Sequence, residues 1–449
     1  MKYVIKFNYG KKRETEMTKK ILFVFILFNL LYADTNAQPY KVKSLKEQSA
    51  LRNEWLKIRL DKVLPAVMKR EGIDMWVIMN REYNEDPVYL TLVPQPSFSA
   101  RRLSVLIFYL NPKGEFEKII IAKRRSDDIY KNAWPDDIKD QWQAIAKVIE
   151  GRNPAKIGLN YSNEFVFGDG LTWYLKEMLM KNLNDNLKER IVSAEKVAVG
   201  WLETRIPEEM ALYPEIVSIA HSIIAEAFSS KVIIPGTTTN EDVEWWMREK
   251  ISSYGMDAWF QPTVDIVRPS GSPFKNTPVI QKGDMLHCDM GLVYLGFSTD
   301  TQQLAYVLKE GETGAPEGLK KGLQEGNRLQ DILLEEMKAG LSGNQILKSS
   351  LEKAKAEGLN PSIYTHPLGF HGHGAGPLIG LWDSQGGVPG RGDYLLFPFN
   401  CHSIELNVKT AVPEWNNELI TFALEQDAFF DGMKCKFIDK RQEEFYLIR

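Results

Sequence analysis

Five side chains able to bind metal ions lie along the last third of this sequence, and they constrain its fold more than any other feature. They are Asp289, Asp300, His373 (with His371 as its near neighbour), Glu405 and Glu425. Four carboxylates and one imidazole form the ligand set of a centre in which two divalent ions share carboxylate bridges and hold a hydroxide between them. Without cations, four acids on apolar strands would be a cluster of unpaired buried charges, which proteins avoid. The sequence therefore predicts two divalent metal ions, and Mn, Co, Zn or Fe would suit these ligands.

The length and charge of the chain limit its class and its partners. It has 449 residues, enough for two domains and a sizeable core. Its formal net charge of -3 gives no reason to expect nucleic acid or an anionic membrane surface as a partner.

The N-terminus has the pattern of a bacterial secretory signal peptide over residues 1–37. Lys19 and Lys20 precede the apolar run 21–32, which is too short to cross a bilayer, and small residues lead to a cleavage site after Ala37. Met17 is a more natural start for this signal than Met1. We therefore expect an exported protein, periplasmic or secreted, without a stable membrane anchor. A hydrophobic anchor or a buried helix is the alternative interpretation of the same run.

Alternating strand-like and helix-like runs predict a smaller α/β domain over residues 38–200. Helix is expected over 42–71, 136–149 and 171–180, and strand over 75–79, 103–110, 118–122 and 157–159. Pro65 is expected to kink or shorten the first helix.

A second domain is predicted over residues 201–449. Pro207 followed by two glutamates is typical of a helix start. Further helix is expected up to about 228 and over 240–254, 318–338 and 344–357. The rest reads as strand and loop, which indicates an α+β catalytic domain.

The acids are expected on two hairpins. A turn centred between Tyr294 and Leu295 would place Asp289 opposite Asp300, with Cβ atoms ~5 Å apart, near enough to share an ion. Residues 403–408 alternate polar and apolar, so Glu405 would lie on one face of a continuous strand. A turn at 413–417 would then return the chain to Glu425.

This pattern resembles the creatinase/aminopeptidase ("pita-bread") metallopeptidases, which include methionine aminopeptidase, aminopeptidase P and prolidase. Their ligands occur in the order Asp, Asp, His, Glu, Glu, and their first two Asp are eleven residues apart, as here. The segment Gly372-His373-Gly374-Ala375-Gly376 is similar to the family's Gly-His-Gly-Ile-Gly, and Ser403-Ile404-Glu405 is similar to Thr-Ile-Glu. Residues 205–220 and 280–291 resemble the opening helix and the first acidic strand. The α/β domain in front is similar to that of the proline-specific and creatinase branches.

The resemblance implies a role for each ligand. Asp289 would chelate the first metal, and Asp300 and Glu425 would bridge both. His373 and Glu405 would hold the second, with Glu405 also exchanging a proton with the metal-bound water. His371 remains the rival imidazole, because an extended strand would place it on the same face as His373.

Two histidines that the family's peptidases use for substrate are missing from their expected places. The stretch 269–278 contains no His, and Trp382-Asp383 stands where a second His normally follows the metal ligand. Such imidazoles stabilise the oxyanion, so His366 or His371 would have to replace them from another position. Residues 301–303 read Thr-Gln-Gln where Thr-Arg-Thr is common.

The resemblance therefore implies an exported dinuclear-metal hydrolase that cleaves an amide bond by metal-activated hydroxide attack, as an Xaa-Pro aminopeptidase or dipeptidase. Its partner would be a short peptide, and a homodimer is expected by analogy. Two alternatives remain open. One is a non-peptidase enzyme of this fold that acts on a small amide or amidine, and the other is a non-catalytic metal-binding or peptide-binding protein.

Overall fold

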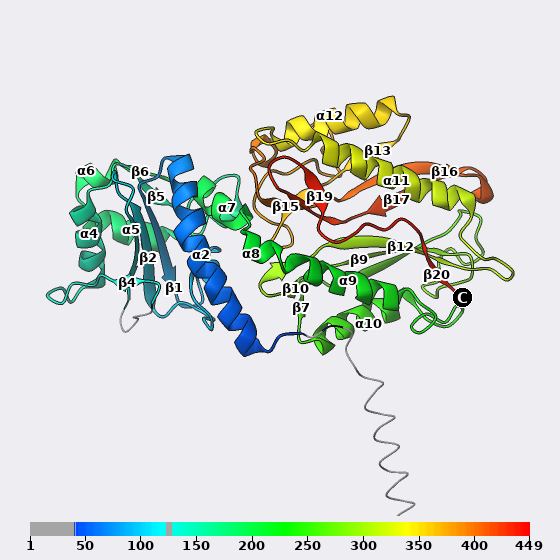
Figure 1. Cartoon of the computed structure of the whole chain (residues 1–449), viewed down its shortest axis with the longest axis horizontal. Coiled ribbons are helices and arrows are strands. Elements are labelled where there is room, and N and C mark those ends of the chain that lie inside the picture. The colour runs from blue at the N-terminus through cyan, green and yellow to red at the C-terminus, as the bar shows by residue number, and fades with distance from the viewer. Residues whose placement is uncertain (1–39, 41, 123–127) are drawn as a thin grey trace, which may run out of the picture. The chain divides into compact units, whose positions relative to one another are not determined.

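The computed structural model describes residue 40 and residues 42–122 and 128–449 (Figure 1). Residues 44–449 form one folded unit. The predicted signal peptide and its cleavage site lie outside the described residues. Among the helices of the described part, none is long and apolar enough to cross a membrane.

The first part of the chain builds a mixed six-stranded sheet in the order β4-β3-β2-β1-β5-β6. Its strands are β1 (Met75–Arg81), β2 (Leu103–Leu110), β3 (Phe116–Ile121), β4 (Lys131–Asn132), β5 (Ile157–Leu159) and β6 (Ile191–Ser193). Its helices are α2 (Leu45–Glu71), α3 (Tyr89–Leu92), α4 (Gln141–Arg152), α5 (Trp173–Asn182) and α6 (Asp185–Lys188), with a 3₁₀ turn η1 at Val166–Gly168. Apolar residues of α4 and α5 pack with β1, β2, β3 and β5 in one core. The α/β organisation predicted for this region is confirmed.

Helix α2 has clear signals at both ends. Ser44 and Glu47 form a reciprocal capping box, and Gly72 ends the helix in the left-handed conformation at φ 65°. The helix continues through Pro65, so the expected shortening at that residue does not occur.

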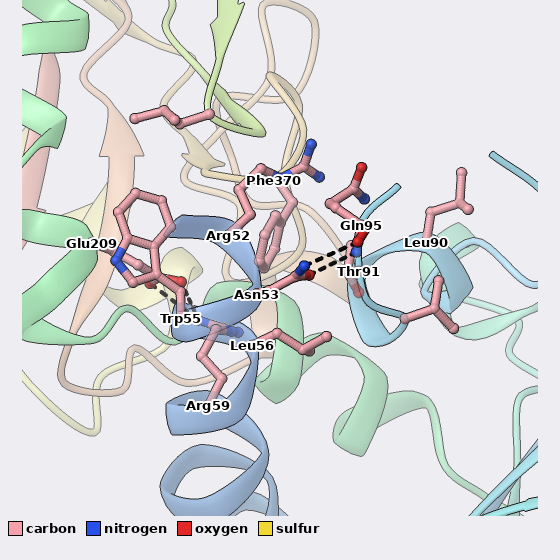
Figure 2. A pocket seen from close by; sticks show the side chains of 12 residues that line it. Arg52, Asn53, Trp55, Leu56, Arg59, Leu90, Thr91, Gln95, Glu209 and Phe370 are labelled. Atoms are coloured by element: carbon pink, nitrogen blue, oxygen red, sulfur yellow. Dashed lines mark hydrogen bonds and ion pairs between the residues drawn. The ribbon is translucent and has the colours of Figure 1, made fainter. Parts of the chain in front are cut away.

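Helices α7 (Glu195–Glu203) and α8 (Pro207–Met210) connect the first sheet to the second part of the chain. Arg59 of α2 forms a buried ion pair with Glu209 of α8, with Nη1 3.1 Å from Oε1. Figure 2 shows this pair in the wall of a small cavity. Arg59 also donates to the main-chain oxygens of Trp201 and Thr204, which satisfies carbonyl groups at the end of α7. The proposed boundary near residue 200 falls inside α7 and stays a prediction.

The second part of the chain contains four small sheets and four longer helices. Its strand orders are β20-β12-β9-β8, β11-β10-β7, β13-β16-β17 and β14-β15-β18-β19. Helices α9 (Tyr213–Ala227) and α10 (Asn240–Ser253) contact the first of these sheets, and α11 (Glu317–Glu336) contacts β16 and β17 and packs on α12 (Gly343–Ala356) (Figure 1). The strands are β7 (Asp257–Ala258), β8 (Thr263–Val267), β9 (Met285–Met290), β10 (Leu292–Tyr294), β11 (Phe297–Ser298), β12 (Thr301–Val307), β13 (Pro361–Ile363), β14 (His366–Leu368), β15 (Asn400–Ser403), β16 (Leu406–Val412), β17 (Glu418–Leu424), β18 (Asp427–Phe430), β19 (Cys435–Phe437) and β20 (Tyr446–Ile448). Short 3₁₀ turns occur at η2 (Arg391–Asp393) and η3 (Pro413–Trp415). This second part has the α+β organisation that the sequence predicted.

The register of the acidic hairpin differs from the predicted one. Tyr294 pairs with Phe297, so the turn is centred between Leu295 and Gly296. Both of these residues have positive φ, 56° and 83°, as a two-residue type I′ turn requires. The shift places Gln302, rather than Asp300, directly opposite Asp289.

Candidate metal centre

Three neighbouring segments of the chain cross between the sheet β13-β16-β17 and the sheet β14-β15-β18-β19. The candidate site lies where they cross. Each pair of strands, β13 and β14, β15 and β16, and β17 and β18, is interrupted by two residues. The interruptions are 364–365, 404–405 and 425–426, so Glu405 and Glu425 lie at the crossings rather than within a strand. The continuous strand predicted over 403–408 is therefore wrong, because the main chain changes hydrogen-bonding partners here. The amide of Ile404 donates to Gln426, and the carbonyl of Glu405 accepts from Tyr364.

The two aspartates come from the neighbouring hairpin. Asp289 lies on β9, and Asp300 immediately precedes β12, where its main-chain amide donates to Asp427 at 3.1 Å. Although the two aspartates are not register partners, they and Glu425 each offer an oxygen within 4.8 Å of the others. The structure thus brings together all four predicted acids.

His366, at the start of β14, projects into this group of acids. Its Nε2 atom lies 3.3 Å from Glu425, 3.5 Å from Asp300 and 3.7 Å from Glu405. Its other ring nitrogen, Nδ1, lies 3.1 Å from the carbonyl oxygen of Pro367. A proton on Nδ1 leaves the Nε2 lone pair free for a ligand, and this is the usual way in which a metal-binding histidine is oriented.

The oxygen and nitrogen atoms of this cluster are suited to binding a cation, because they have no hydrogen-bond partners among themselves. Four of them are buried without a hydrogen-bond partner: Asp289 Oδ1, Asp300 Oδ1, Glu425 Oε1 and His366 Nε2. Buried polar atoms are normally hydrogen-bonded. Three carboxylate oxygens and an imidazole nitrogen that converge without donors match the hard and borderline ligands preferred by Mn, Fe, Co and Zn. The residues therefore fit a divalent metal site.

The burial of these acids also raises their pKa values. Burial, with repulsion from Glu425 and Asp289, raises the pKa of Glu405 to about 10. Burial also raises the pKa of Asp289 and of Glu425 to about 7, and it raises that of Asp300 well above its ordinary value. Bound cations would reverse this effect by favouring the charged carboxylates.

The three histidines of segment 366–373 have different surroundings. His373 is exposed, yet one of its ring nitrogens lies within 4.8 Å of ligand atoms of Asp300 and His366. His371 belongs to none of the metal-capable groups among the described residues, and its ring stacks on Phe167 with centroids 4.2 Å apart. Burial lowers the pKa of His366 and His371 to about 4, and partial burial together with repulsion from His366 and Arg391 lowers the pKa of His373 to about 4, so each is neutral near pH 7.

Two residues near the acids were missed as site residues by the sequence analysis. Gln302 donates from Nε2 to Glu405 Oε1 at 2.8 Å. The Tyr364 hydroxyl lies 3.5 Å from His373 Nε2. Gln302 follows Asp300 by two residues, so strand alternation could have placed it on the same face. Tyr364 is distinguished in the sequence only by its position two residues before His366.

A cavity of about 580 Å³ opens beside the acids. It is lined by His366, His373, Tyr364 and Arg391 together with residues 163–167, which lead into η1. Its volume lies in the range of small-ligand sites, and its lining combines imidazole, phenol and guanidinium groups.

Comparisons with known proteins agree with this fold. No curated protein matches the sequence. Among solved structures, an X-Pro aminopeptidase from Thermotoga maritima MSB8 is 16% identical with a TM-score of 0.59, and the match covers 84% of this chain and 99% of that one. An Xaa-Pro dipeptidase from Bacillus anthracis is 16% identical with a TM-score of 0.59, over 88% of this chain and 100% of that one. A dipeptidase from Pyrococcus horikoshii OT3 is 17% identical with a TM-score of 0.56, over 87% and 100%.

At these identities the structural matches show a shared fold, a pita-bread domain preceded by an α/β domain, which confirms the predicted architecture. The family assignment comes from the sequence itself. A sequence model of metallopeptidase family M24 matches residues 213–429, the stretch that holds every predicted ligand, and through this catalytic part the chain belongs to metallopeptidase family M24.

Proposed function

We propose that the protein is an exported dinuclear-metal peptidase that cleaves the bond before proline, as an Xaa-Pro aminopeptidase or dipeptidase. The observation that carries the proposal is the gathering of unpartnered buried oxygens of Asp289, Asp300 and Glu425, with the unpartnered Nε2 of His366 beside Glu425 and Asp300. Membership of family M24 supports peptidase chemistry. The proline preference is taken from what the structural neighbours are called. Export rests on the N-terminal sequence pattern alone.

Five residues would hold two divalent ions in this proposal: Asp289, Asp300, His366, Glu405 and Glu425. His366 replaces His373 as the imidazole ligand, because its Nε2 faces three of the acids and its Nδ1 faces a carbonyl oxygen. When bound, the cations supply Lewis acidity, which polarises a carbonyl group and makes a water molecule more acidic.

Glu405 would carry the proton during the reaction. It would accept a proton from the attacking water and pass it to the leaving amine, as a general base and then a general acid. It is the most suitable acid for this role, because it is the most exposed of the buried acids Asp300, Glu405 and Glu425, at 7%, and it borders His366 in the cavity wall.

His373, Tyr364 and Arg391 would bind the substrate. His373 takes the place of the substrate imidazole that is missing from its expected position in the sequence, since it lines the cavity with its ring centroid 4.6 Å from that of His366. As a neutral imidazole it can donate one hydrogen bond to a developing oxyanion. Arg391 adds a positive charge to the lining of the same cavity, suited to the carboxylate of a short peptide.

The test is metal-dependent turnover by the mature chain from about Gln38. The protein would be stripped with a chelator, reloaded with Mn, Co or Zn, and assayed on Xaa-Pro dipeptides and tripeptides alongside peptides without proline. We expect release of the N-terminal residue before proline, and only by the reloaded protein. Cleavage by metal-free protein would refute the mechanism. Two bound metals without cleavage of any peptide would favour a small amide or amidine substrate instead.

Two substitutions test the proposed bridging acids. Asp300→Asn and Glu425→Gln should each abolish metal-dependent cleavage, because an amide cannot supply the negative charge that two cations share. Glu325→Gln is the matched control, since it removes a half-buried carboxylate on α11 that accepts from Thr410 outside the site. Its turnover should equal that of the wild type.

A further inference from the structure

We propose that Gln302 is a positioning residue that orients Glu405 and Asp289 for metal binding, and that His287 and Asp265 fix the orientation of its amide. The inference rests on the proposed function for the identity of these acids as ligands. It goes beyond that function by assigning a role to three residues that do not bind the metals themselves.

Gln302 occupies a central place in the framework of the site. It lies on β12, 4% exposed, directly opposite Asp289 on the neighbouring strand β9. Its main chain also pairs with Glu425, with each amide donating to the other residue's carbonyl at 3.1 and 3.3 Å. One residue therefore connects β9, the strand of Asp289, to the crossing that holds Glu425.

The side chain of Gln302 contacts two of the acids. Its Nε2 lies 2.8 Å from Glu405 Oε1 and 3.4 Å from Asp289 Oδ2. An amide NH₂ group has two protons, one for each carboxylate, and it has no further donor. These bonds fix which oxygen of Glu405 stays free to face His366.

His287 holds the other end of the amide. Its Nε2 lies 3.0 Å from Gln302 Oε1, and its Nδ1 lies 3.1 Å from Asp265 Oδ2. The amide oxygen can only accept, so Nε2 of His287 is the donor. Reversal of the amide would place its oxygen against two carboxylates and its NH₂ group against an N–H. The imidazole therefore selects the orientation that suits the acids.

The contacts cross three adjacent strands, from the surface to the centre. Asp265 on β8 has a side chain that is 71% exposed, and it is the register partner of His287 on β9, whose side chain is 14% exposed. Gln302 on β12 completes the series. Partners of this kind orient metal ligands, and their loss typically costs about 10–100-fold in metal affinity.

The experiment measures metal affinity rather than turnover. The mature chain from about Gln38 would be titrated with Mn²⁺ or Zn²⁺ alone, by calorimetry or by competition with a chelating dye. We expect Gln302→Met to weaken at least one of two binding steps by about 10–100-fold. The matched control is Gln303→Met. Gln303 is the adjacent residue, 2% exposed on the opposite face of β12, where its Oε1 accepts from the Tyr446 hydroxyl at 2.8 Å.

Thermal unfolding of the metal-free proteins would establish that both variants fold. The metal affinity of Gln303→Met should stay within about threefold of that of the wild type, because the side chain of Gln303 bonds to Tyr446 and not to the acids of the site. Equal losses in the two variants, or no loss in Gln302→Met, would overturn the proposal.

A double-mutant cycle tests whether His287 acts through Gln302. His287→Phe should weaken metal binding in the wild-type background and cost nothing further in Gln302→Met, because coupled residues are not additive. Fully additive losses would overturn this part of the inference. Wild-type protein that binds two metals supports the proposed centre whatever the variants do. Wild-type protein that binds none would refute both the centre and the inference.

Discussion

At the scale of single residues, the main question is which imidazole of segment 366–373 binds metal. In the sequence, the glycine-flanked His373 matches a family motif, and His371 is its rival on the same strand face. The structure supplies the missing information, because a short strand β14 turns His366 toward Glu425 and Asp300 and leaves His373 exposed beside the cavity. His366 faces the acids because it is the first residue of β14, and His373 lies beyond the end of that strand.

Substitution of the two histidines should separate ligand from substrate contact. Loss of a residue that only orients a ligand typically lowers metal affinity about 10–100-fold. His366→Ala removes a ligand itself, so it should lower the affinity for one metal by more than that. His373→Ala should keep two metals bound and lower kcat, since it removes a donor aimed at the substrate. Metal content by mass spectrometry and steady-state kinetics check both.

His371→Ala serves as the control for this pair. It removes an imidazole that stacks on Phe167, away from the acids. Metal content should therefore stay at the wild-type value. Loss of metal in His373→Ala together with full retention in His366→Ala would return the ligand role to His373.

At the scale of elements, the packing of α11 on its sheet depends on glycine. A Cβ atom at Gly322 would overlap the ring of Phe422 on β17, and that ring is fully buried. Gly151, near the end of α4, faces open space, because a Cβ atom there meets nothing within 4 Å. The two glycines have the same helix propensity and opposite surroundings.

Alanine at these two positions should change stability in opposite directions. Gly151→Ala should raise the free energy of unfolding by up to about 1 kcal/mol, because alanine is the better helix former. Gly322→Ala should lower it by about 1–3 kcal/mol, because overpacking against a rigid core outweighs propensity. Denaturant titration of both variants measures the difference. A stabilised Gly322→Ala would mean that α11 can move away from β17 at little cost.

Sequence reasoning was most successful for elements with a strong local pattern. The strands predicted over 103–110 and 157–159 have those bounds in the structure, and the helix predicted over 42–71 begins three residues later. It failed where hydrogen-bond pairing between distant segments determines the register or the end of a strand. The hairpin register depended on which two residues adopt positive φ, and the sequence admits Tyr294-Leu295 as well as Leu295-Gly296. The crossing at Glu405 is set by neighbouring strands, which the alternation of 403–408 does not reveal.

At the scale of the whole molecule, a buried carboxylate joins three distant parts of the chain. Glu203, at the end of α7, accepts from the Tyr394 hydroxyl at 2.9 Å and from the Asn400 amide at 2.7 Å. Arg70 of α2 lies 3.6 Å from the same carboxylate. Burial nevertheless raises the pKa of Glu203 to about 8, because desolvation outweighs the attraction of Arg70.

The raised pKa of Glu203 predicts the direction of one term in the pH dependence of stability. The folded state binds this proton more tightly than the unfolded state, so the contribution is complete below the ordinary pKa of 4.5 and is lost as pH rises through about 8. Between these values the free energy of unfolding should fall by up to a few kcal/mol, at about 1.4 kcal/mol per pH unit. Glu203→Gln keeps the shape and removes the titration. The difference in unfolding free energy between wild type and Glu203→Gln, measured at pH 5 and pH 8 with metal content held equal, should therefore move in favour of the variant at the higher pH. A difference that is constant with pH would show that Arg70 keeps Glu203 charged throughout.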